Sequence, residues 1–72
     1  MNDFDFGNYL CGLRVGSGLS QKELAARLGV SDKAVSKWEN GRSKPSSQTL
    51  LHLAKLFGIS TDALLTGGKR KE

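Results

Sequence analysis

Few side chains in this sequence could act in catalysis or bind a metal, and they lie far apart. The single histidine, His52, stands among leucines with no acidic residue or cysteine at a useful spacing. The single cysteine, Cys11, has no cysteine or histidine at the spacing of a metal site, and alone it cannot form an internal disulfide. No glycine-rich phosphate-binding loop is present. We therefore expect no enzyme activity, no metal, no cofactor and no small-molecule ligand.

Basic and polar side chains that could bind a partner gather after residue 31. Lys33 and Lys37 are four residues apart, a spacing that places two side chains on one face of a helix. A lysine can donate to O6 and N7 of guanine, and Asp32 can accept from N4 of cytosine. Asp32 can equally serve to stabilise the positive end of the helix. The pattern predicts a face that reads DNA bases, formed by Asp32, Lys33, Ser36 and Lys37.

A second set of polar side chains lies at the ends of the predicted helices, where a duplex backbone would pass. The amide of Gln21 can donate to a phosphate beside the free N–H groups of a helix end. The other phosphate-contact candidates are Ser31, Asn40, Arg42, Ser43 and Lys44. Eleven Lys and Arg against seven Asp and Glu give a net charge of +4, which suits a polyanionic partner. Charge alone would fit a solvated basic surface equally well.

Two short helices joined by a tight turn must position these side chains. Ser20 and Glu23 form a capping-box pattern at the start of the first helix. Gly29 follows that helix, where a left-handed residue most easily ends it, and Ser31 can cap the second. Trp38 could stack on a base, but its spacing from Val35 favours the core.

This stretch resembles the helix-turn-helix of phage-repressor-like regulators, the Cro/C1-type (XRE) family. The matching features are Gln21 at the first helix, Ala25 at the helix crossing, Gly29 in the turn, Val35, and Trp-Glu-Asn-Gly at 38–41. The resemblance implies that the second of these helices enters the major groove by its N-terminal end. In similar domains an arginine at the end of helix one pairs with the glutamate after the tryptophan. Arg14 and Glu39 stand at those positions.

The resemblance extends over the whole helical unit and implies an all-α, five-helix repressor-like DNA-binding domain. We expect helices at about 6–15, 21–28, 32–40, 47–57 and 61–66, and no strand. Residues 1–5 are expected to form a flexible lead, 6–67 the domain and 68–72 a basic flexible tail. Gly7 and Gly12 should each weaken the first helix by up to about 1 kcal/mol relative to alanine.

The resemblance implies sequence-specific binding of double-stranded DNA and transcriptional regulation, with repression the favoured mode and a homodimer on a pseudo-palindromic site. The main alternatives are an antitoxin that also binds a toxin, for which 72 residues leave little room, and a protein-interaction module of the same fold. An enzyme fragment is disfavoured by the missing catalytic groups. No apolar run approaches the roughly 20 residues that span a membrane, and the N-terminus is acidic rather than basic. We expect a cytoplasmic protein with no targeting segment.

Overall fold

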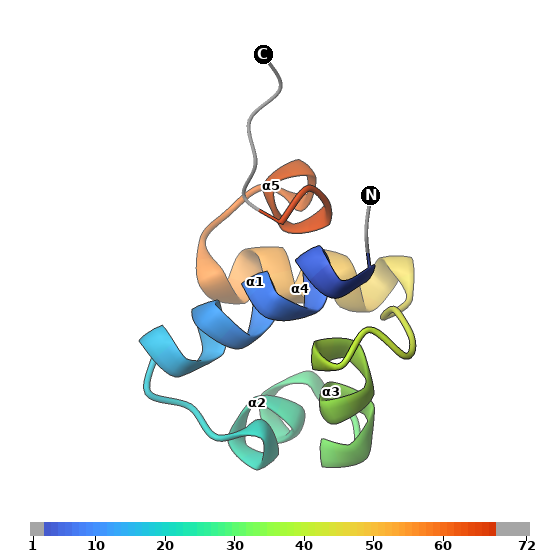
Figure 1. Cartoon of the computed structure of the whole chain (residues 1–72). Helices are drawn as coiled ribbons and strands as arrows, with labels where there is room; N and C mark the ends of the chain where they lie inside the picture. The colour runs from blue at the N-terminus through green and yellow to red at the C-terminus, as the bar shows by residue number, and fades with distance from the viewer. Residues whose placement is uncertain (1–2, 68–72) are drawn as a thin grey trace.

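A computed structural model describes residues 3–67 of the chain, which form five α-helices and no strand (Figure 1). Their bounds are α1 (Asp3–Gly16), α2 (Gln21–Leu28), α3 (Asp32–Glu39), α4 (Ser47–Phe57) and α5 (Thr61–Leu65). The predicted all-α, five-helix class is confirmed. None of the helices in this part of the chain is long and apolar enough to cross a bilayer.

The start of the first helix differs from the prediction. α1 begins at Asp3 rather than at about residue 6, so residues 3–5 belong to the helix. Residues 1 and 2 and the predicted tail at 68–72 lie outside the described residues. Gly67 approaches this first turn closely, since a Cβ on it would lie 3.0 Å from the Asp5 carbonyl oxygen. α3 and α5 each end one residue earlier than predicted, which is within the ordinary ambiguity of helix ends.

Serine caps start four of the five helices. The side chains of Ser20, Ser31, Ser46 and Ser60 each accept a hydrogen bond from the backbone N–H three residues on. The Ser20 cap is a complete capping box, since the Glu23 carboxylate also accepts from the Ser20 N–H at 2.9 Å. These local bonds define where each helix begins and therefore how the turns are placed.

One apolar core joins the helices. The buried side chains in it are Phe6, Leu10, Leu24, Ala25, Val35, Trp38, Leu53 and Leu64. In Figure 1, α2 and α3 lie together at one end of the molecule, α1 and α4 in the middle, and α5 at the other end. Trp38 packs in this core as expected, so it is not placed to stack on a base.

Gly7 allows α1 to approach the end of α3 at very short range. A Cβ on Gly7 would lie 2.6 Å from the carbonyl oxygens of both Trp38 and Glu39, closer than atoms can pack. A Cβ on Gly12 would meet nothing within 4 Å. Both glycines are expected to weaken the helix, but only at position 7 does the packing of α1 against α3 require a glycine.

Candidate nucleic-acid interface

α2, a tight turn and α3 form the helix-turn-helix unit. Gly29 ends α2 with φ 72°, in the left-handed region that glycine adopts without steric cost. The Val30 N–H then donates to the Ala25 carbonyl at 3.0 Å. Ala25 itself is buried, as the close crossing of the two helices requires. This turn sets the angle at which α3 leaves α2.

α3 has one face in the core and one face toward solvent. Val35 and Trp38 are buried in the core. Asp32, Lys33 and Lys37 are exposed, and Ser36 is half-buried beside them. The four side chains predicted to read bases thus share the outward side of one helix, with both of its lysines accessible.

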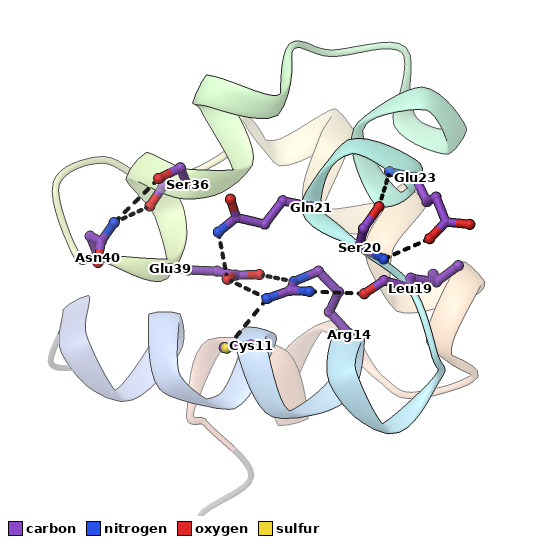
Figure 2. A network of polar contacts seen from close by, with 9 residues as sticks. All are labelled: Cys11, Arg14, Leu19, Ser20, Gln21, Glu23, Ser36, Glu39 and Asn40. Atoms are coloured by element: carbon purple, nitrogen blue, oxygen red, sulfur yellow. Dashed lines mark hydrogen bonds and ion pairs between the residues drawn. The ribbon is translucent and has the colours of Figure 1, made fainter.

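Two of the predicted DNA-contact residues also close the ends of α3. The Ser31 Oγ accepts from the Ala34 N–H at 3.2 Å, which leaves its own proton available for donation. The amide nitrogen of Asn40 donates to the Ser36 carbonyl at 2.9 Å and approaches its Oγ at 3.3 Å. Asn40 is therefore folded back onto the helix that it ends (Figure 2).

Arg42, Ser43 and Lys44 form the segment that leaves α3. Arg42 and Lys44 are exposed, and Ser43 is half-buried. The Arg42 backbone N–H donates to the Lys37 carbonyl at 2.9 Å, which ties the segment to the last turn of α3. These three phosphate-contact candidates therefore follow directly after the C-terminal end of α3.

Arg14 and Glu39 form an ion pair that joins the end of α1 to the end of α3. The Arg14 Nε donates to Oε2 of Glu39 at 2.7 Å, and Nη2 donates to Oε1 at 3.1 Å. The Nη1 of the same guanidinium donates to the Leu19 carbonyl at 2.8 Å, and Nη2 lies 3.7 Å from the Cys11 sulfur. The side chains are only 13% and 6% exposed. Figure 2 shows this network from close by.

The network keeps Glu39 ionised. Burial raises the pKa of this carboxyl group, but hydrogen bonds from Arg14 and Gln21 outweigh it and lower the pKa below its ordinary value. The hydrogen bond to Glu39 in turn raises the pKa of Arg14. Two opposite charges are thus paired inside the domain, and the exposed lysines of α3 are not offset by Glu39.

Gln21 has an internal partner that the sequence reasoning missed. Its amide nitrogen donates to Oε1 of Glu39 at 3.0 Å across 18 residues of sequence. Gln21 is half-buried at the first position of α2. Once two helices are folded into a helix-turn-helix, the start of the first faces the end of the second. That geometry is the signal that could have indicated the contact.

His52 and Cys11 lie apart from the helix-turn-helix face. His52 is exposed on α4, where it lines an open depression of about 450 Å³ with Gln48, Leu51 and Lys55. Cys11 is half-buried on α1. Among residues 3–67, no group of three or more His, Cys, Asp or Glu side chains could hold a metal ion.

Comparison with known proteins identifies relatives over most of the domain. A helix-turn-helix family model matches residues 13–64. The HTH-type transcriptional activator BcrR of Enterococcus faecalis is 41% identical over 63 residues, which are 88% of this chain and 31% of that protein. The chain thus spans less than a third of the length of this relative.

Solved structures share the fold. The solution structure of the DNA-binding domain of the P22 C2 repressor superposes with a TM-score of 0.81 at 32% identity, covering 100% of this chain and 95% of that one. The restriction-modification controller protein C.AhdI from Aeromonas hydrophila superposes with a TM-score of 0.78 at 33% identity, covering 88% and 91%.

Proposed function

Because the chain belongs to the helix-turn-helix family, we propose that it binds double-stranded DNA sequence-specifically and regulates transcription. One observation carries the proposal: the outward face of α3 presents Asp32, Lys33 and Lys37 while Val35 and Trp38 hold the helix on the core. A protein-interaction module of the same fold would not need two accessible lysines there. BcrR is named a transcriptional activator and C2 a repressor protein, which favours a regulatory function.

In the proposed complex the N-terminal end of α3 enters the major groove. Asp32 and Lys33 then lie nearest the base edges, with Ser36 and Lys37 one turn further along. The phosphate backbone passes the start of α2 at Gln21. Further phosphate contacts come from Ser31, Asn40, Arg42, Ser43 and Lys44. Contacts to phosphate supply much of the affinity, and contacts to base edges supply the specificity.

The domain acts in this scheme by binding alone, without a chemical step. Two copies bind a pseudo-palindromic site as a homodimer, with half-sites about 34–36 Å apart or a multiple of that spacing. Repression is the mode that we favour, since it requires only that the protein occupy its site. We place its action in the cytoplasm, in keeping with its helix-turn-helix family.

Selection of bound sequences from a random duplex library tests this function. The selected duplex and a scrambled duplex are then titrated at several salt concentrations. We expect affinity to fall steeply with salt, because lysine and arginine release counterions from phosphate. We expect the selected site to bind at least about 10³-fold more tightly than the scrambled one. A folded protein that binds no duplex at low salt would be a protein-interaction module instead.

A further inference from the structure

The carboxylate of Glu39 determines which way the Gln21 amide points. An ionised carboxylate can only accept hydrogen bonds, so the group that faces it at 3.0 Å must be the Gln21 NH₂ rather than its oxygen. Gln21 therefore has its amide nitrogen toward Glu39 and its Oε1 directed away (Figure 2). Only one of the two amide hydrogens is used by this bond.

Arg14 holds Glu39 in place for this contact. Its guanidinium donates to both carboxylate oxygens, at 2.7 and 3.1 Å. A third donation reaches the Leu19 carbonyl, two residues before Gln21. The same side chain thus anchors the end of α3 and the segment that leads into α2. Arg14 thus fixes the carboxylate that binds the Gln21 amide and also the chain two residues before Gln21.

We propose that Glu39 is a positioning residue for DNA binding, which holds the Gln21 amide by one N–H so that the other is presented to a phosphate oxygen. The inference rests on the proposed function, in which the start of α2 meets the DNA backbone. Glu39 touches no DNA in this arrangement, since its side chain is 6% exposed and its oxygens accept from Arg14 and Gln21. Arg14 neutralises the carboxylate, which would otherwise repel phosphate.

The expected benefit is that Gln21 is ordered before DNA arrives. A free glutamine side chain loses rotamer freedom when it is fixed at an interface, and this ordering weakens binding by roughly two- to tenfold. A Gln21 already held by Glu39 avoids most of that loss. The contribution of Gln21 to DNA affinity should therefore depend on Glu39.

A double-mutant cycle between Gln21→Met and Glu39→Met measures this dependence, because methionine leaves no oxygen that could accept from the Gln21 amide. The probe is a fluorescent 30-base-pair duplex of arbitrary sequence at low salt, because a phosphate contact requires no particular bases. We expect Gln21→Met to weaken binding roughly two- to tenfold in the Glu39 background and clearly less in the Glu39→Met background. The negative charge that Glu39→Met removes affects both arms alike and cancels in the cycle.

Lys22→Met is the matched control, because Lys22 is the next residue of α2 and is exposed. It should weaken binding by the same factor in both backgrounds. An equal effect of Gln21→Met in both backgrounds would overturn the positioning role while leaving DNA binding itself intact. A wild-type protein that fails to bind the duplex would instead contradict the proposed function.

NMR relaxation of side-chain amides tests the same inference in the wild-type protein without DNA. The Gln21 NH₂ group should be rigid, whereas that of Gln48, exposed on α4, should be mobile and serves as the reference. This measurement needs no substituted protein, so it tests the proposal even if Glu39→Met fails to fold. A Gln21 amide as mobile as that of Gln48 would overturn the proposal.

Discussion

Gly7 lies so close to Trp38 that a Cβ on the glycine would sit 2.6 Å from the tryptophan carbonyl oxygen. The obstacle is backbone rather than a flexible side chain, so it cannot simply turn aside. The end of α3, which follows the DNA-reading face of the proposed function, is thus seated directly against the backbone of α1. This relationship makes the position of α3 depend on a residue far from it in sequence.

Gly7→Ala should destabilise the domain. An added methyl gains up to about 1 kcal/mol in helix propensity, but forcing α1 away from α3 costs about 1–3 kcal/mol or more. We expect a lower free energy of unfolding in urea denaturation. Gly12→Ala is the control, because that site is exposed and open, and should stabilise by up to about 1 kcal/mol. Equal effects of the two substitutions would contradict the close approach.

Arg14→Ala should destabilise far more than a surface substitution. The pair is largely buried, so the loss of one partner leaves a charge without compensation, at a cost of about 3 kcal/mol or more. Arg27→Ala on the exposed side of α2 should change stability by less than about 0.5 kcal/mol. Chemical denaturation of Arg14→Ala, Glu39→Ala and Arg27→Ala compares them. Unchanged midpoints in the first two would rule out a structural pair.

Stability should fall in acid through Glu39. Its pKa in the folded protein lies below its ordinary value because the hydrogen bonds of Arg14 and Gln21 outweigh its burial. The contribution is therefore complete above the unfolded pKa of about 4.3 and is lost as the pH falls through the lower folded pKa. The difference in unfolding free energy between wild type and Glu39→Gln should narrow over that pH range in urea denaturation.

Glu23→Gln is the control, because glutamine can keep the capping box, and its difference from wild type should be smaller. A difference for Glu39→Gln that stays constant with pH would contradict the role assigned to Glu39.

Base reading and backbone anchoring should separate along the helix-turn-helix. Lys33→Ala should relax the preference at one base pair and cost about 1–3 kcal/mol on the selected site. Arg42→Ala, beyond the end of α3, should weaken all sequences about equally and reduce the salt slope by about one. Titrations of both variants on selected and scrambled duplexes measure the difference. If Lys33→Ala lost the same factor on both duplexes while Arg42→Ala changed the preferred base, the two roles would be exchanged.

Much of the fold could be predicted from the sequence because its signals are local. The serine caps bond to N–H groups three residues away, and Gly29 ends α2 through its own φ angle. The periodicity of Val35 and Trp38 likewise identified the inner face of α3, and thereby its outward face. Each of these features depends on residues within about one helical turn, so the amino-acid types alone are informative.

Tertiary structure decided the features that join residues distant in the chain. The start of α1 lies close to Gly67, just beyond α5, where an added Cβ would be 3.0 Å from the Asp5 carbonyl oxygen. The glycine at position 7 is required only because α3 packs across it, and the Gln21 amide turns toward Glu39 only because α2 and α3 are folded together. Propensity and spacing carry no information about such contacts, since their partners are neighbours in space alone. The sequence therefore determined which side chains α3 could present to DNA, and the packing of α1, α2 and α3 decided how they are held.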